Sequence, residues 1–162
     1  MKTQALGLLA LVGLAACGSN DSPTQPTTPA PRIAGTYSAQ WLIQFIRSND
    51  GFTGSFNCYG IMSITQPNGT SNAITGFATV GSPCPPLTFD ISGTVQPDGT
   101  LAFVSGGPRP PEGQCPAAVG TQYSGVVTET SLSAHATAML NCPGPGEGPH
   151  RFDYILSAWR SS

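Results

Sequence analysis

Residues 87–105 read LTFDISGTVQPDGTLAFVS, and this stretch decides the fold class. In its first half the apolar side chains Leu87, Phe89, Ile91 and Val95 alternate with Thr88, Asp90, Ser92 and Thr94, and Gly93 takes the remaining position on the apolar face. Alternation with a period of two is typical of a β-strand that buries one face. Asp98-Gly99 then supplies a turn, because such a pair tolerates the positive φ angles of a tight hairpin. The stretch therefore predicts two antiparallel strands joined by a short turn.

The same alternation recurs on both sides of this hairpin, and no segment shows a sustained apolar face at helical spacing. Eight strands are expected, at residues 36–45, 56–66, 72–80, 87–96, 100–105, 121–128, 131–140 and 151–160. An antiparallel up-and-down meander of eight strands commonly closes into a small barrel, since closure removes exposed strand edges. The sequence thus predicts an all-β fold, with a closed barrel as the first interpretation and a β-sandwich as the alternative.

The connections between these strands alternate in kind. Those at 66–70, 96–100 and 129–130 are short, whereas 46–55, 81–86, 106–120 and 141–150 are longer and rich in Gly and Pro. In a meander, alternate connections lie at the same end. We therefore expect a tight end and a loop-rich mouth, with the first strand beginning at the tight end.

The N-terminus carries a secretory signal. Lys2 is followed by a short apolar run at residues 6–12 and then by Leu14-Ala15-Ala16-Cys17. A membrane span would need roughly 18 or more apolar residues, so this run is too short to be one. The segment resembles the lipobox of bacterial lipoproteins, in which cleavage precedes a cysteine that becomes acylated. The resemblance implies lipid attachment at Cys17, and Gly18 in place of a retention aspartate implies the outer membrane of a bacterial envelope.

Three parts follow from this division. Residues 1–16 form the signal peptide, 17–31 the lipidated cysteine with a Pro-, Thr- and Ser-rich tether, and 32–162 the β-barrel domain. The tether has too few apolar side chains to offset the entropy of ordering it.

The whole chain has six Lys or Arg against eight Asp or Glu. That balance argues against nucleic acid as a partner.

Four of the five cysteines remain once Cys17 is acylated, and an even number in an oxidising compartment predicts two disulfides. Pairing Cys58 with Cys84 and Cys115 with Cys142 would enclose one predicted hairpin each. Pairing Cys84 with Cys115 and Cys58 with Cys142 is the alternative. There is no C-x-x-C spacing, so neither a metal nor any other cofactor is expected.

The first and last strands carry a second, smaller resemblance. Gly35-Thr36-Tyr37 opens the first strand, and Trp159-Arg160 ends the last one. This is similar to lipocalins, in which a Gly-x-Trp on the first strand is covered by an arginine near the end of the barrel, although tyrosine stands here for tryptophan. The resemblance implies a closed barrel and raises a carrier of a small apolar ligand as an alternative function.

Candidate ligand-binding residues fall into two groups. Inner aromatic residues would contact an apolar ligand, although large and small residues facing one another are equally typical of a packed core. Charged residues of the mouth loops would fix a polar group. The first group is Tyr37, Trp41, Phe89 and Phe103, and the second is Arg47, Arg109, Glu112, His150 and Arg151.

No catalytic residue is predicted. The chain lacks a Gly-x-Ser-x-Gly elbow and a phosphate-binding glycine loop, and His135 lies on the polar face of its strand. We expect a non-catalytic binding or envelope-structural module, whose partners are membrane lipid at Cys17 and either a small apolar ligand or an envelope protein. A hydrolytic enzyme with an unrecognised site in the mouth loops is the remaining alternative.

Overall fold

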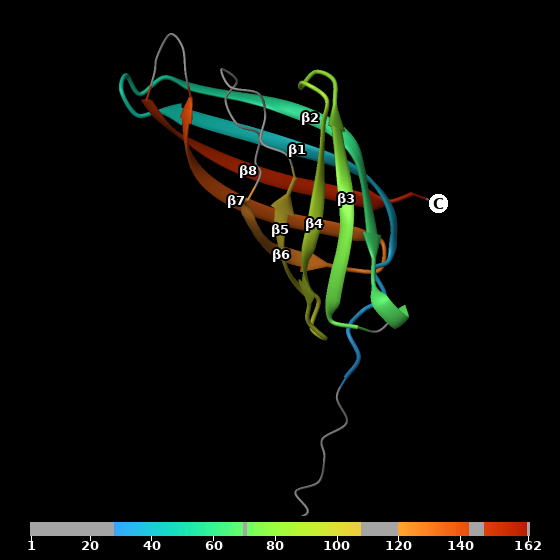
Figure 1. Ribbon diagram of the computed structural model, residues 1–162. Coiled ribbons are helices and arrows are strands. Elements are labelled where there is room, and N and C mark those ends of the chain that lie inside the picture. Colours follow the sequence, from blue (N-terminus) through green and yellow to red (C-terminus); the bar gives the residue numbers. More distant parts are fainter. Residues whose placement is uncertain (1–27, 70, 108–119, 143–147, 162) are drawn as a thin grey trace, which may run out of the picture.

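The computed structural model describes residues 28–69, 71–107, 120–142 and 148–161, and it is all-β (Figure 1). A single 3-10 turn, η1 (Pro67–Gly69), accompanies the strands. In these ranges no helix is long and apolar enough to cross a membrane. The eight strands are β1 (Gly35–Arg47), β2 (Thr53–Thr65), β3 (Ala73–Gly81), β4 (Leu87–Val95), β5 (Thr100–Gly106), β6 (Gln122–Val127), β7 (Ser131–Cys142) and β8 (Gly148–Arg160).

The strands form a closed antiparallel barrel in sequence order, with β1 pairing with β8. The predicted barrel is therefore confirmed, and the β-sandwich alternative is wrong. Inward-facing residues alternate with outward-facing ones along each strand, as the sequence pattern predicted. Closure places all inward side chains in one core, which runs from Ile33 and Tyr37 at one end to Phe152 at the other.

Four glycines let the strands coil tightly enough to close. Gly60, Gly76, Gly93 and Gly125 each lie so close to the neighbouring strand that an added Cβ would overlap a backbone carbonyl oxygen. Glycine at such points permits a close backbone approach and a bend that a side chain would prevent. These four positions therefore shape the barrel.

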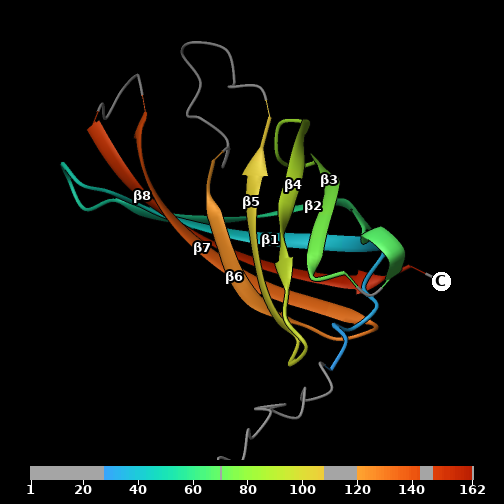
Figure 2. The ribbon, with the colours of Figure 1, turned by 60° about the horizontal axis from the view of Figure 1, so that its bottom comes forward.

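The strands are unequal in length, and the difference creates a projecting sheet. β1, β2 and β8 have 13 residues and β7 has 12, whereas β5 has 7 and β6 has 6. In Figure 1 and Figure 2 the four long strands continue past the ends of β5 and β6. β2 pairs with β3 only from Tyr59 onward, so Thr53–Cys58 have β1 as their ladder partner. We call this projecting four-stranded sheet, in the order β2, β1, β8, β7, the extension.

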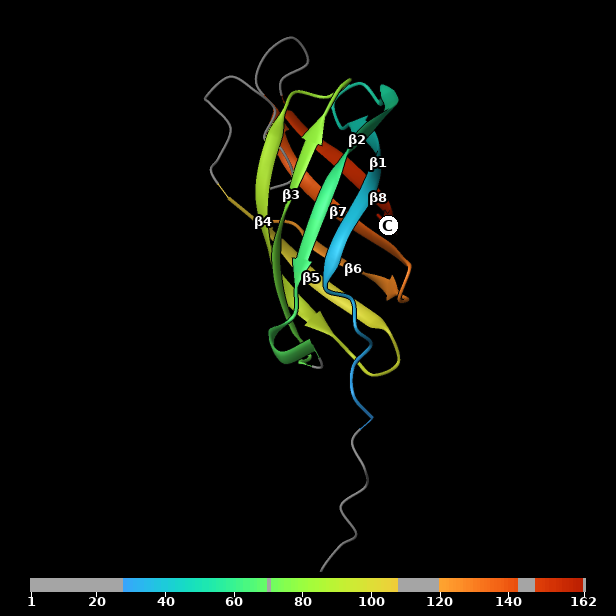
Figure 3. The same ribbon diagram turned by 90° about the vertical axis from the view of Figure 1, so that its right-hand side faces the viewer.

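Alternate connections lie at the same end of the barrel, as predicted for a meander, but the described lengths do not separate a tight end from a loop-rich one: the β2–β3 connection spans residues 66–72, whereas the β1–β2 and β3–β4 connections span 48–52 and 82–86. Figure 3 shows residues 28–34 and η1 at one end and the β1–β2 and β3–β4 turns at the other. At the tight end, Asn68 and Gly99 adopt positive φ angles of 56° and 84°, as expected for Asn-Gly and Asp-Gly turns. Asp98 Oδ1 accepts a hydrogen bond from Thr100 N at 2.9 Å and holds the second turn. The chain thus enters the barrel opposite the mouth.

Candidate functional site

The tight end is sealed by the segment that precedes β1. Ile33 is fully buried, and Ala30, which the composition assigns to the tether, is only 3% exposed. The Gln66 side chain joins three backbone groups: its Oε1 accepts from Ile33 N, and its Nε2 donates to Pro31 O and Ser71 O, at 3.0, 3.1 and 2.7 Å. We call this arrangement the Gln66 clasp.

Tyr37 lies beside the clasp at the tight end of the barrel, whereas a ligand was expected at the mouth. Its hydroxyl donates to Ile33 O at 2.7 Å, and the Arg160 guanidinium lies 5.9 Å from the centre of its ring. Arg160 also donates to the carbonyl oxygens of Glu129 and Ala34. Burial raises the pKa of Tyr37, and the positive charge of Arg160 partly opposes that rise. The structure therefore gives this pair a role in sealing the tight end.

The middle of the barrel is filled by aromatic rings. Trp41, Phe89 and Phe103 are 2%, 4% and 3% exposed. Trp41 meets Phe89 edge to face at 6.1 Å, and Phe103 stacks on Tyr123 at 4.7 Å. A void that could hold water would leave ring surface accessible, so these three candidates are packed side chains in the core.

Two further tyrosines belong to this layer, although neither was among the predicted inner aromatic residues. Tyr123 and Tyr154 are 2% and 4% exposed, with ring centres 6.2 Å apart. Burial raises the pKa of both, and for Tyr123 the charge of Tyr154 adds to the rise. The alternation of Phe152, Tyr154, Leu156 and Ala158 along the last strand was the signal that identifies Tyr154 as an inner residue.

The mouth carries a partly exposed aromatic cluster on the inner side of the extension. The Phe45 ring lies within 5.9 to 6.3 Å of the rings of Phe52, Phe56 and Phe152, measured between ring centres. Phe52 is 51% and Phe56 39% exposed, whereas Phe152 is 9% exposed. We call these four phenylalanines the mouth cluster.

Two predicted rim residues adjoin the mouth cluster. The Arg47 guanidinium lies 4.5 Å from the centre of the Phe52 ring and pairs with Asp50 at 2.8 Å. The His150 ring lies 6.2 Å from that of Phe152, and its Nδ1 is 2.9 Å from Gly148 O. Arg47 Nε is shielded from solvent and has no hydrogen-bond partner among the described residues. The structure therefore brings a cation and an imidazole to one aromatic surface.

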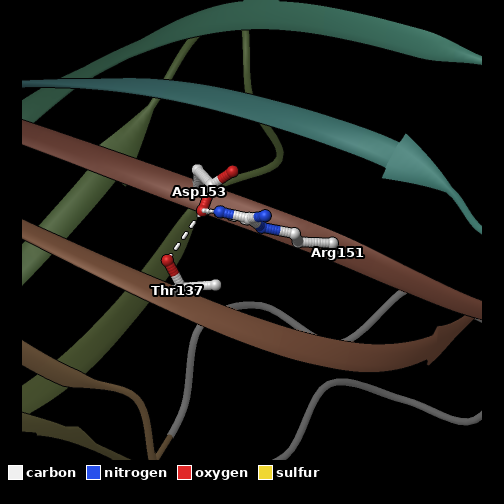
Figure 4. Close-up of polar contacts among 3 residues, drawn as sticks. All are labelled: Thr137, Arg151 and Asp153. Carbon is white, nitrogen blue, oxygen red and sulfur yellow. Dashed lines mark hydrogen bonds and ion pairs between the residues drawn. The ribbon is translucent and has the colours of Figure 1, made fainter.

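Arg151, the neighbour of His150, points the opposite way. Its guanidinium donates to Asp153 Oδ1 on the outer face at 3.1 Å, and the same oxygen accepts from Thr137 of β7 at 2.7 Å (Figure 4). The hydrogen bond from Thr137, followed by the interactions with Arg151, lowers the pKa of Asp153. Arg151 is thus not part of the mouth cluster. Arg109 and Glu112 lie outside the described residues.

One disulfide joins the middle of β2 to the β3–β4 connection. Cys58 and Cys84 are joined, with their Cα atoms 5.4 Å apart, so the first predicted pairing is confirmed for these two residues. The alternative pairing of both with other cysteines is wrong. A loop of this length contributes about 3 kcal/mol of stability in the chain-entropy account. Cys115 and the Cys142 side chain lie outside the described part of the structure.

An outer groove of about 360 Å³ lies over β4, β5 and β6. Its walls are small or neutral side chains, and it holds no charged group: Ser92, Gly93, Ala102, Phe103, Val104, Gln122, Tyr123 and Ser124. In the ranges that the structure describes, no three His, Cys, Asp or Glu residues are grouped as metal ligands. The mouth cluster therefore offers the most distinctive chemistry in these ranges, namely exposed aromatic rings beside a guanidinium.

Comparisons of the chain with protein-family models, with curated proteins and with solved structures found no match.

Proposed function

We propose that this chain is a lipid-anchored lipoprotein of the bacterial envelope whose barrel is a non-catalytic binding module. Two features support the anchor. Leu14-Ala15-Ala16-Cys17 matches a lipobox, and the Pro-rich segment after it has the composition of a semi-rigid spacer of about 3 Å per residue. Attachment of several acyl chains would hold the protein without any help from basic residues.

The proposal rests on one observation: the N-terminal segment and the mouth cluster lie at opposite ends of the barrel. The segment that leads from Cys17 joins the barrel at the Gln66 clasp, whereas the mouth cluster includes Phe52 of the β1–β2 turn, which lies at the other end (Figure 3). A barrel anchored in this way would present the mouth cluster away from the lipid surface. Phe52 and Phe56 would then be accessible to a ligand or to another envelope component.

The chemistry of the mouth cluster favours an apolar ligand or side chain that also carries a negative charge. Aromatic rings supply contact area, and the Arg47 guanidinium, held between the Phe52 ring and the Asp50 carboxylate, supplies N–H donors for an anionic group. A lipocalin-like carrier remains within this proposal only with its ligand at the mouth, because Trp41 and Phe89 fill the barrel below.

One experiment tests both halves of the proposal. The wild-type chain, Cys17→Ser and Ser19→Ala are produced in a diderm bacterium with a radiolabelled fatty acid, and the membranes are floated on a density gradient. We expect label and flotation for the wild type and for Ser19→Ala, and neither for Cys17→Ser. A labelled, floating Cys17→Ser protein would show that the anchor is assigned wrongly.

The floated wild-type membranes are then titrated with anilinonaphthalene sulfonate, an aromatic anion that fluoresces in apolar sites, against membranes without the protein. Arg47→Gln and Phe56→Ser should each weaken the protein-dependent signal by about tenfold, the effect of losing one good contact. The matched control is Phe77→Ser, since Phe77 is 47% exposed on the outer face of β3. Equal weakening by all three variants would rule out the mouth cluster as the binding surface.

A further inference from the structure

The free edge of β2 in the extension has a row of backbone groups without a strand beside it. Thr53–Asn57 pair with β1 on one side, opposite Ile46 to Leu42. On the other side, β3 pairs with β2 only from Tyr59 onward, and no other described strand takes its place. Four of the five residues are exposed, and Gly54 is half-buried.

This edge lacks the features that usually protect an edge from pairing. Such protection comes from charged side chains, prolines, bulges or a covering segment. Thr53–Asn57 read TGSFN, with no charge and no proline. Their register with β1 is one-to-one, so no bulge turns the edge away. The edge is therefore suited to receive another strand.

We propose that Thr53–Asn57 pair antiparallel with the same residues of a second copy of this chain, about a two-fold axis at Ser55. A row of unpaired N–H and C=O groups is complementary to another extended backbone. An antiparallel strand is also complementary to itself, so one patch serves both subunits in a closed pair. Because the five residues are uncharged, the symmetric approach brings no like charges together.

The side chains at this edge fit that register. With Ser55 on the axis, Phe56 faces Gly54 of the second copy. The Phe45 ring already lies over Gly54 from the β1 side, since an added Cβ there would be 2.5 Å from ring atoms of Phe45. An aromatic ring from a neighbouring strand commonly covers a strand glycine in this way. Phe56, now 39% exposed, would be partly covered in the same step, which leaves Phe52, 51% exposed, as the more accessible ring of the mouth cluster in the pair.

The outer face of the pair would be polar. Thr53, Ser55 and Asn57 alternate with the inward residues, and Thr53 would face Asn57 of the second copy. Cross-strand pairs of such side chains can exchange hydrogen bonds. The two extensions would then join as one continuous sheet, with the two barrels at its ends.

Disulfide trapping tests this proposal. In an antiparallel ladder, Cα atoms of directly opposed residues lie about 4.5 to 5.5 Å apart, within the range of a disulfide. Ser55→Cys in the full chain, expressed with its own signal, should give a species of doubled mass on a non-reducing gel. Thr75→Cys is the matched control, because Thr75 is an exposed outward residue near the start of β3 that has β2 on one side and β4 on the other. It should stay at the mass of one chain.

A charge variant provides a second measurement on the folded protein. Ser55→Lys places two positive charges on the axis and should raise the concentration at half-dimerisation, measured by native mass spectrometry, by about tenfold or more. Ser133→Lys, on the outer face of β7, should leave it unchanged. The proposal is overturned if Ser55→Cys remains monomeric, if Thr75→Cys cross-links equally, or if Ser55→Cys is trapped on a different protein instead.

Discussion

Gln66 shows how much of this structure depends on a single side chain. Its amide accepts from one buried backbone N–H and donates to two carbonyl oxygens from segments on either side of it in the sequence. The residue itself is 5% exposed. Replacing a buried amide that satisfies this many backbone groups costs stability, because each partner would lose its hydrogen bond and would have no water molecule to take its place.

We therefore predict that Gln66→Ala lowers the free energy of unfolding by about 2 to 3 kcal/mol, because Ile33 N and the facing carbonyl groups would be left buried and unpaired. Urea denaturation followed by circular dichroism measures the change. Gln44→Ala is the control, since Gln44 is exposed on the outer face of β1. It should lie within about 0.5 kcal/mol of the wild type. Equal midpoints for the two variants would contradict a structural role for the clasp.

Sequence alone could not have found the clasp. The composition of residues 18–31 is that of an unstructured tether, yet Ala30 is buried and Pro31 O accepts from Gln66, 35 residues away. Local composition carries no information about a contact at that separation. By contrast, the opposite directions of His150 and Arg151 follow from strand alternation alone, because Phe152 and Tyr154 point inward.

Strands were predictable as elements, and their ends were less so. All eight were found from period-two alternation, but β2 begins at Thr53 and β8 at Gly148, each three residues before the expected start. Residues 53–55 and 148–150 contain Gly, Ser and Pro, which are typical of loops. They are strand because β1 continues beside the start of β2 and β7 continues beside the start of β8, so the ends were set by pairing with a partner and not by local propensity.

The inner glycines give a prediction for the strands that they bend. Gly76→Ala should destabilise the barrel by about 2 kcal/mol or more, because the new Cβ would overlap the Ser63 carbonyl oxygen and push β2 and β3 apart. Thermal unfolding measures the loss. In Gly81→Ala, at the end of the same strand, the new Cβ would meet Tyr59 O at an ordinary 3.7 Å. A melting temperature for Gly76→Ala as high as for Gly81→Ala would show that the close approach is not required.

The barrel as a whole encloses three tyrosine hydroxyl groups, and this affects its response to alkali. Burial raises the pKa of Tyr37, Tyr123 and Tyr154 above the ordinary value of 10.0. The folded state then holds these protons at a pH where the unfolded chain releases them. The resulting stability is fully present below pH 10 and is lost as the pH rises beyond it.

We expect the free energy of unfolding to fall steeply above pH 10 and the slope to be shallower in Tyr123→Phe, which has one buried hydroxyl fewer. Denaturant unfolding at a series of pH values measures both slopes. Tyr59→Phe is the control, since Tyr59 is 53% exposed on the outer face, and it should reproduce the wild-type slope. If Tyr123→Phe and the wild type lose stability in parallel, the alkaline sensitivity arises elsewhere.

The place where the chain joins the barrel also determines how the protein would bear a mechanical load. A pull along the N-terminal segment reaches the clasp and then β1, which lies between β2 and β8 along nearly its whole length. Such a pull acts parallel to the strand, so the ladder bonds on both sides resist it together as a shear. A pull on an edge strand from its end would instead break those bonds one after another. Tension along the N-terminal segment would thus meet the barrel in its strongest direction.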